Sequence, residues 1–294
     1  MHASKVTDPR IETLTKLGLE RHALELETCG YTVVEEAIDP DVTARALEAT
    51  LRTFGERVGK VPNVSTGEDY EGYWVSRYML LQDPVFEEVV MAEKVLALVD
   101  YAVGSDCILS TLTAHIRGQG GGQSLPTGYL PLHGDDTSPQ PHPNFYNSIT
   151  VNICLTDLTE ESGCLAFVPG SHKRLRQPTD AERIVAGEGA NPEIVPMVAP
   201  AGSAVIWPSH TWHGSWVSET PGLRVTLAEL YGRPHIQPYE MYRETVGDEV
   251  LARNTERFGT LMGMDTMYGW DNYQDDWHKN WRHRDRERYR PKVI

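Results

Sequence analysis

Positive charge, cysteine and long apolar runs are all scarce in this sequence of 294 residues. Lysine and arginine number 27 against 42 acidic residues, which gives a formal net charge of −15. Such a charge opposes binding to nucleic acid or to an anionic membrane surface. No stretch approaches the roughly 20 apolar residues of a membrane-spanning helix, and the first residues do not combine a basic segment with an apolar run. We therefore expect a cytoplasmic protein that acts on a small molecule, without nucleic-acid or membrane partners.

The few cysteines also exclude some kinds of site. Cys29, Cys107, Cys154 and Cys164 lie in apolar surroundings, and no pair has Cys-x-x-Cys spacing. This spacing argues against a zinc site or a redox dithiol built from cysteines. Buried free thiols in a reducing compartment are the expected state, and a secreted protein with two disulfides is the alternative.

A His-x-Asp pair stands in the segment Leu132-His133-Gly134-Asp135. Side chains of an extended strand alternate between its two faces, so His133 and Asp135 lie on the same face. A distant histidine, His213, can complete a triangle of ligands around a metal ion. Two histidines and one carboxylate leave three adjacent positions of an octahedral iron open, which suits non-haem Fe(II) enzymes that bind a co-substrate beside O2.

Arg224 follows His213 after the turn Glu219-Thr220-Pro221-Gly222. This spacing leaves room for one strand end, a turn and entry into the neighbouring strand, so we expect Arg224 to point back toward the metal. A guanidinium group is a planar two-pronged donor, which can anchor the far carboxylate of a metal-chelating dicarboxylate. Thr226, two residues on, shares that face and can add a hydroxyl donor.

These segments and others along the chain resemble the phytanoyl-CoA dioxygenase family of Fe(II)/2-oxoglutarate oxygenases. The resemblance runs from about Gly30 to Tyr231, and its pieces occur in the family's order. The pieces are Leu132-His133-Gly134-Asp135, Glu161-Ser162-Gly163-Cys164-Leu165, Val168-Pro169-Gly170-Ser171-His172-Lys173, Ala201-Gly202-Ser203-Ala204-Val205-Ile206-Trp207, and His213-Gly214-Ser215 through Arg224. The Pro-Gly-Ser-His-Lys turn is the most specific of them.

The resemblance implies a fold that is mainly β with flanking helices, around a double-stranded β-helix (jelly-roll, cupin-like) core. It implies that His133, Asp135 and His213 hold Fe(II), that Arg224 holds 2-oxoglutarate, and that O2 is the second co-substrate. It carries over no particular substrate. We expect one catalytic domain over residues 1–294, with the core and N-terminal helices at about 30–235 and a C-terminal helix and tail at 238–294.

Three further positions are candidates for contacts to the bound molecules. Ser215 shares a face with His213 and can donate to the chelating end of 2-oxoglutarate. His115 lies on the strand before a Gly-rich loop, where it either contacts 2-oxoglutarate or serves as an ordinary core histidine. Asn152 either reaches the bound molecules or is satisfied inside its sheet.

Two neighbouring residues compete with the proposed ligands. His210 and His213 are three residues apart and therefore point to opposite faces of an extended chain, so only one can point inward. We expect His213 to be the ligand and His210 to be a loop or rim residue. The same parity favours Asp135 over Asp136. Asp135 is two residues after His133 and shares its face of the strand, whereas Asp136 is three residues after His133 and does not.

Hydrophobic patterning places helices and strands around these motifs. We expect a helix at about 10–28, a strand at 30–34, and a helix at 42–58 that Asp39 caps and Pro40 opens. Strands are expected at 106–116, 147–157 and 203–207, and loops at 118–129 and 136–143. Residues 239–263 suit a helix, and the aromatic and charged tail after it is expected to cover the active-site mouth or a neighbouring subunit, as in a homodimer.

The sequence thus predicts a 2-oxoglutarate-dependent dioxygenase that oxidises, and most simply hydroxylates, a C–H bond of a small organic molecule. The carboxylate of Asp135 argues against halogenation, because a halide would need its coordination position. Two alternatives stay open. One is a cupin-like metalloenzyme without redox chemistry, against which Arg224 and Thr226 argue. The other is a ligand-binding jelly roll that keeps the metal but has lost turnover.

Overall fold

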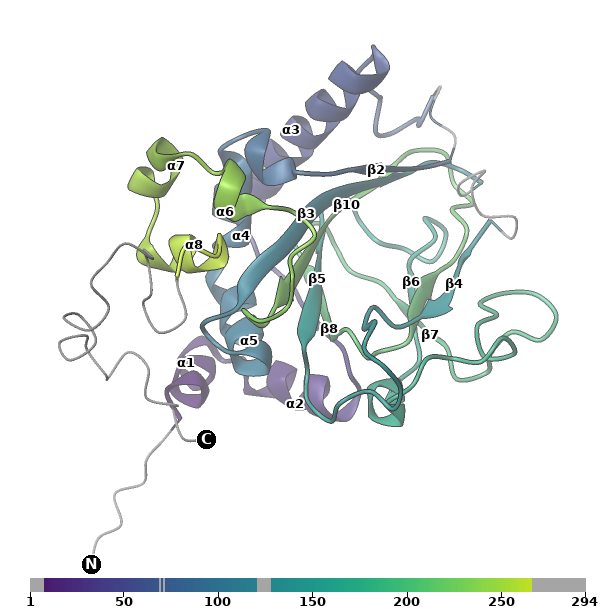
Figure 1. Ribbon diagram of the computed structural model, residues 1–294. Helices are drawn as coiled ribbons and strands as arrows, with labels where there is room; N and C mark the ends of the chain where they lie inside the picture. Colours follow the sequence, from purple (N-terminus) through teal and green to yellow (C-terminus); the bar gives the residue numbers. More distant parts are fainter. Residues whose placement is uncertain (1–7, 69, 71, 121–127, 266–294) are drawn as a thin grey trace, which may run out of the picture.

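The computed structural model describes residues 8–68, 70, 72–120 and 128–265, which form two antiparallel sheets with helices packed on one side (Figure 1). The expectation of a mainly β chain with flanking helices is confirmed. Most of the loop predicted at 118–129 and the tail from residue 266 onward lie outside the described residues. Among the described residues, none of the helices has both the length and the apolar character needed to span a bilayer.

The larger sheet has six strands in the order β1-β8-β5-β10-β3-β2, and every neighbouring pair is antiparallel. Its strands β3, β5 and β8 confirm the strands predicted at 106–116, 147–157 and 203–207. The bounds are β1 Thr32–Val34, β2 Tyr73–Ser76, β3 Ile108–Arg117, β5 Ser148–Cys154, β8 Ala204–Pro208 and β10 Arg224–Gly232.

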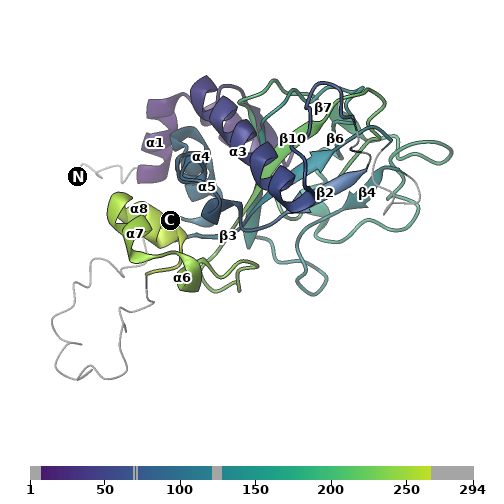
Figure 2. The same cartoon turned by 90° about the horizontal axis from the view of Figure 1, so that it is seen from above.

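The smaller sheet has four strands in the order β4-β9-β6-β7 and faces the larger one. Its strands are β4 Leu130–His133, β6 Leu165–Phe167, β7 Val195–Met197 and β9 His213–Ser215. Phe167 of β6 meets Trp207 of β8 edge-on at 5.2 Å between ring centroids, so side chains of the two sheets interlock. Both views place this sheet on the side of the larger sheet that is turned away from the helices (Figures 1 and 2).

The two faces of the larger sheet differ in what they carry. On β5, Ile149, Val151 and Ile153 belong to the main apolar core together with residues of the helices, whereas Thr150 and Asn152 alternate with them and point the other way. The helices α4 (Val85–Val90) and α5 (Glu93–Val103) contribute much of this core. The polar residues are therefore left facing the smaller sheet, which places a polar site between the sheets.

The N-terminal helical region has two helices where we expected one at 10–28. Asp8 caps α1 (Pro9–Leu17), and α2 (Glu20–Thr28) follows after Gly18. The prediction was wrong at Gly18, which has a left-handed φ of 68° and ends the first helix. The next helix is as predicted, because Asp39 caps α3 (Pro40–Val58) by accepting a hydrogen bond from the Asp41 amide.

The C-terminal helix expected at 239–263 is also wrong as a single element. Three short helices stand in its place, α6 (Tyr242–Thr245), α7 (Asp248–Arg253) and α8 (Glu256–Leu261). The extended backbone of Gly247 separates the first two, and Thr255 starts the third by accepting from the Phe258 amide at 3.4 Å. Local capping signals thus override the apolar periodicity.

All four cysteines are free thiols, as expected, and three of them are buried while Cys29 is half-buried. Two single turns of 3₁₀ helix, η1 (Met79–Leu81) and η2 (Ser171–Arg174), complete the elements that the structure describes.

Candidate metal centre

The three side chains predicted as metal ligands lie together between the sheets. His133 ends β4 and His213 begins β9, and the two residues are direct partners across this strand pair. The Nε2 atoms of His133 and His213 each lie 3.7 Å from Oδ1 of Asp135. One ligand atom of each residue falls within 4.8 Å of the other two, so a single metal ion can contact all three.

Backbone carbonyls hold both imidazole rings in the orientation that a metal needs. Nδ1 of His133 lies 2.9 Å from the Pro131 carbonyl, and Nδ1 of His213 lies 3.0 Å from the Thr211 carbonyl. A carbonyl only accepts, so Nδ1 of each ring carries a proton, and Nε2 is the nitrogen that faces Asp135 and can serve as the metal ligand. Burial lowers the pKa of His213 to about 4, against the opposing charge of Asp135, so this ring is neutral at pH 7.

The two oxygens of the Asp135 carboxylate have different surroundings: one accepts hydrogen bonds and the other faces the histidines. Its Oδ2 accepts from Thr150 Oγ1 at 2.9 Å and from Trp207 Nε1 at 3.4 Å, which leaves Oδ1 toward the histidines. Burial works to raise the pKa of Asp135, but His213, His133 and these hydrogen bonds bring the pKa below its usual value. The carboxylate is therefore ionised and offers one oxygen as a ligand.

The long connection between β6 and β7 clamps the segments that carry the ligands. Gln177 accepts from the Gly134 amide at 2.9 Å and donates to the Gly134 and Asp136 carbonyls at 3.0 Å each. Gly134 lies between two of the ligands, so the Gln177 amide fixes the His-x-Asp turn.

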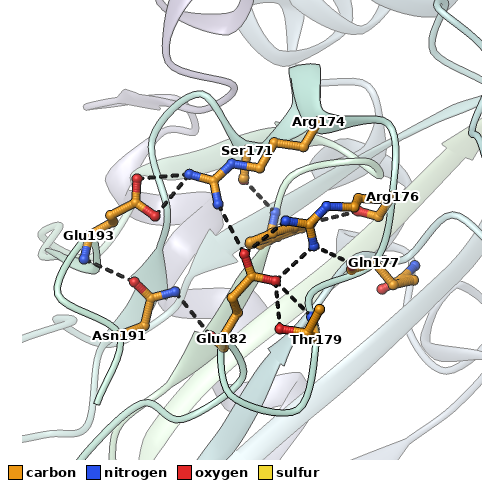
Figure 3. A network of polar contacts seen from close by, with 9 residues as sticks. Ser171, Arg174, Arg176, Gln177, Thr179, Glu182, Asn191 and Glu193 are labelled. Atoms are coloured by element: carbon orange, nitrogen blue, oxygen red, sulfur yellow. Dashed lines mark hydrogen bonds and ion pairs between the residues drawn. The ribbon is translucent and has the colours of Figure 1, made fainter. Parts of the chain in front are cut away.

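The same connection holds Trp212, the residue before His213. Its indole N–H donates to the Arg176 carbonyl at 2.7 Å, and its ring contacts the guanidinium groups of Arg174 and Arg176. Those two arginines are in turn paired with Glu193 and Glu182, in the polar network of Figure 3. The contacts of Trp212 thereby fix the backbone that carries His213.

Two buried arginines lie beside the triad without an acidic partner in the part of the chain that is described. Arg224 starts β10, and its Nη1 donates to the Gly163 carbonyl. Its register partner on β3, Arg117, donates to Ser215 Oγ at 2.6 Å and to the Trp216 carbonyl at 2.8 Å. Burial, with the like charge of Arg117, lowers the pKa of Arg224 to about 9, so it is still a cation at pH 7.

The remaining predicted contacts surround these arginines. Thr226 is buried, lies two residues after Arg224 on β10 and pairs with His115 on β3. Both ring nitrogens of His115 are occupied, Nδ1 by the Tyr73 hydroxyl and Nε2 by Thr113 Oγ1 at 2.9 Å. A direct contact from His115 to a ligand would need one of these bonds to break. Ser215 accepts from Arg117 and keeps its own proton for a further acceptor.

Asn152 lies on the inward face of β5, beside Ala228 of β10 and Val205 of β8. Its side-chain oxygen is buried and has no hydrogen-bond partner among the described residues. Of the two alternatives that the sequence left open for Asn152, satisfaction within the sheet does not hold for this atom.

His210 is a loop residue, as one half of our expectation had it, but it does not lie at a solvent-exposed rim. It lies in the connection between β8 and β9, but it is buried, and its Nε2 is 2.8 Å from Oδ2 of Asp136. His142 lies against the same carboxylate. Sequence reasoning assigned Asp136 and His142 to a loop, and the only signal that could have joined them is the parity that turns Asp136 away from Asp135.

Comparison with known proteins gives a consistent result. The profile described as phytanoyl-CoA dioxygenase (PhyH) matches residues 26–226. An uncharacterised protein of Mycobacterium tuberculosis is 25% identical over 258 residues, covering 86% of this chain and 89% of that protein. A dioxygenase of Aspergillus fumigatus, af480, is 29% identical over 191 residues, covering 64% of this chain and 57% of the fungal protein.

Solved structures share the fold at low sequence identity. HygX from Streptomyces hygroscopicus, with nickel and 2-oxoglutarate bound, has a TM-score of 0.58 at 17% identity, over 75% of this chain and 89% of HygX. The carbocyclase SnoK from nogalamycin biosynthesis has a TM-score of 0.54 at 19% identity, over 80% of this chain and 90% of SnoK. These similarities confirm the double-stranded β-helix core.

Proposed function

Since this chain belongs to the phytanoyl-CoA dioxygenase family, we propose that it is an Fe(II)- and 2-oxoglutarate-dependent dioxygenase. The reaction we propose is hydroxylation of a C–H bond in a small organic molecule. When bound, iron and 2-oxoglutarate supply the oxidising chemistry, in which one atom of O2 enters succinate, the other enters the product, and CO2 is released.

The donor set of His133, Asp135 and His213 fits this metal. Two imidazole nitrogens and one carboxylate oxygen, grouped on one side, leave coordination positions for a chelating co-substrate and for O2. Thr150 and Trp207 fix the carboxylate, and the two backbone carbonyls fix the rings. The ligands are thus preorganised by groups that are not ligands themselves, as is usual for metal sites in proteins.

The observation that carries the proposal is the buried Arg224, which has no carboxylate partner among the described residues. Burying a cation without a counter-ion destabilises the folded protein, so such a group normally belongs to the binding site of an anionic ligand. The carboxylate of 2-oxoglutarate that does not chelate the metal is an anion of matching shape for the guanidinium. Thr226 lies on the same strand face and can donate its hydroxyl to the same carboxylate.

The surrounding side chains also exclude water from the His213 side of the centre. Phe167 stacks against the His213 ring at 6.0 Å, and Trp207 lies against the same ring at 4.8 Å. His133 and Asp135 are half-buried, so the opening of the site lies on their side. We propose that the small-molecule substrate enters there.

The test is an anaerobic titration of the metal-free protein with Fe(II) and 2-oxoglutarate, monitored by the weak visible charge-transfer absorption of the chelate. We expect the band in the wild type and in a control variant, Arg52→Ala, which removes an exposed arginine paired with Asp83. The band should weaken in Arg224→Ala. If no band forms although iron is bound, the dioxygenase proposal fails, and a cupin-like metalloenzyme or a binding protein becomes the better explanation.

Product analysis then separates hydroxylation from other outcomes on this fold. SnoN, one of the structurally similar proteins, is described as an epimerase, and SnoK as a carbocyclase. SnoN and SnoK are both described as dependent on α-ketoglutarate, that is 2-oxoglutarate, so dependence on this co-substrate alone does not single out hydroxylation. We expect a product heavier than the substrate by one oxygen atom, and label from ¹⁸O2 in that product.

A further inference from the structure

Asp136, His142 and His210 form a second buried cluster beside the candidate metal centre. Their exposed fractions are 5%, 4% and 3%. Nε2 of His210 lies 2.8 Å from Oδ2 of Asp136, and Nδ1 of His142 lies 3.8 Å from Oδ1. The two imidazole rings are nearly parallel, at 10° with centroids 5.2 Å apart, and both lie against the carboxylate.

The geometry points to a second metal site formed by these three side chains, and we propose that it holds a divalent transition-metal ion of the zinc type. Nothing in the proposed dioxygenase reaction requires this ion. The donors of the site are two imidazole nitrogens and one carboxylate oxygen, which is a set that zinc accepts.

The strongest sign of a missing ligand is His142. Neither of its ring nitrogens has a hydrogen-bond partner among the described residues, although both are buried. An imidazole with neither nitrogen satisfied in the interior loses the hydrogen bonds that water would give it. Nδ1 is too far from Asp136 for a hydrogen bond at 3.8 Å, so the ring faces the carboxylate without bonding to it.

The separations suit atoms that share a metal ion. Ligand nitrogens and oxygens lie about 2.0–2.2 Å from zinc, so two ligands of one ion are roughly 3–4 Å apart. The first centre shows 3.7 Å for both histidine–aspartate pairs. The 3.8 Å between His142 and Asp136 repeats that spacing, and the 2.8 Å of His210 has to lengthen slightly.

A cavity of about 270 Å³ lies beside one member of this cluster: its wall includes His210, together with Tyr146, His172 and Arg233, but neither Asp136 nor His142. Zinc with three protein ligands keeps a further position for water or another small ligand. The cavity also carries Lys173, so the ligand that it can supply is water or a small anion.

The position of the cluster gives the ion a structural role. Asp136 directly follows Asp135, and His210 lies in the connection that leads to His213. The two segments already touch through the Asp136 amide, which donates to the Ser209 carbonyl at 3.0 Å. An ion shared by Asp136, His142 and His210 would fasten these segments together, and with them two ligands of the first centre.

The experiment is a zinc count on the full chain by equilibrium dialysis against Zn²⁺ followed by elemental analysis. We expect two zinc ions per wild-type chain, since Zn²⁺ also occupies the first centre. One ion should remain in His133→Ala/His213→Ala and one in His142→Gln/His210→Gln. A control variant, His235→Gln, removes an exposed histidine and should keep both ions.

Two results overturn the proposal. One is that His133→Ala/His213→Ala retains no zinc, and the other is that His142→Gln/His210→Gln retains as much as the wild type. Should the latter variant fail to fold by circular dichroism, the decision passes to Co²⁺ added to His133→Ala/His213→Ala. Visible d–d absorption from protein-bound cobalt supports the site, and its absence overturns it. Neither measurement uses 2-oxoglutarate or turnover, so failure here leaves the proposed dioxygenase function intact.

Discussion

Arg224 and Arg117 are register partners on β10 and β3, so two buried guanidinium groups lie on the same face of the larger sheet. Two like charges side by side, without an acid among the described residues, destabilise the ligand-free protein. The arrangement is understandable if a dianion belongs there, because 2-oxoglutarate brings two negative charges.

The variant Arg224→Lys tests whether the guanidinium acts as a two-pronged donor or only as a charge. Lysine keeps the charge but offers a single ammonium group, so at least one charged hydrogen bond is lost. Such a bond contributes about 1.5–3 kcal/mol, which corresponds to a rise of roughly 10- to 150-fold in KM for 2-oxoglutarate. Steady-state succinate release at varied 2-oxoglutarate measures it, with Arg52→Ala as the control. An unchanged KM would remove Arg224 from the binding site.

The variant Thr150→Val should weaken iron binding without weakening binding of 2-oxoglutarate. It removes the hydroxyl that donates to Oδ2 of Asp135 and hardly changes the side-chain shape. Loss of a group that orients a metal ligand typically costs about 10- to 100-fold in metal affinity. The matched control is Thr50→Val, because the Thr50 hydroxyl is buried and has no hydrogen-bond partner in the described part of the chain, so its removal should cost nothing. Equal iron affinity in both variants would show that Thr150 does not position the ligand.

Gly30 and Gly18 form a matched pair for a stability test. Both have a left-handed φ, 82° and 68° respectively. A Cβ at Gly18 would have nothing within 4 Å, whereas a Cβ at Gly30 would overlap the ring of His172. Gly18→Ala should therefore lower the free energy of unfolding only by the backbone strain, about 1–2 kcal/mol. Gly30→Ala should lower it by clearly more. Urea unfolding measures both, and equal losses would mean that the His172 ring moves aside freely.

The buried Glu229 predicts a pH dependence of stability. Burial raises its pKa to about 8, while Tyr231 donates to Oε2 at 3.0 Å and works against the rise. The folded pKa lies above the unfolded one, so the contribution of Glu229 is fully present below the unfolded pKa. It is lost as the pH rises through the folded value. The free energy of unfolding that is lost in this way is at most about 5 kcal/mol, at roughly 1.4 kcal/mol per pKa unit.

The check is the melting temperature of Glu229→Gln relative to the wild type between pH 5 and pH 8.5. Glutamine cannot ionise, so the melting temperature of the variant should rise relative to that of the wild type as the pH rises. Glu48→Gln, at an exposed position of α3, is the control and should show no such trend. A difference that stays constant with pH would show that Glu229 does not take up a proton on folding.

The alternation of side chains on extended backbone accounts for the parts of the site that the sequence could predict. His133 and Asp135 face one way, as the parity argument predicted, and His213 rather than His210 meets them, as the resemblance of His213-Gly214-Ser215 to the family implied. Arg224 and Thr226 follow from the same alternation on β10. Their assignment to iron and 2-oxoglutarate stays a prediction until the titrations above are done.

Contacts between distant segments account for the parts that the sequence could not predict. Nothing local to Asp136 indicates that His210 will reach it across the interior, or that Gln177 will hold the Gly134 backbone. The three C-terminal helices were missed for a different reason. Their apolar spacing is that of one helix, but Gly247 and Thr255 carry the local signals that interrupt it.

The pairing of His133 with His213 across β4 and β9 has a consequence for the assembly of the protein. The two ligands lie far apart in sequence, so the complete set exists only after the distant strands have closed on each other, and loop-closure entropy opposes that step. Metal binds the closed chain and not the open one, so occupancy stabilises the native state by mass action. Metal uptake should therefore be among the last events of folding, and chelation should shorten the lifetime of the chain against proteolysis.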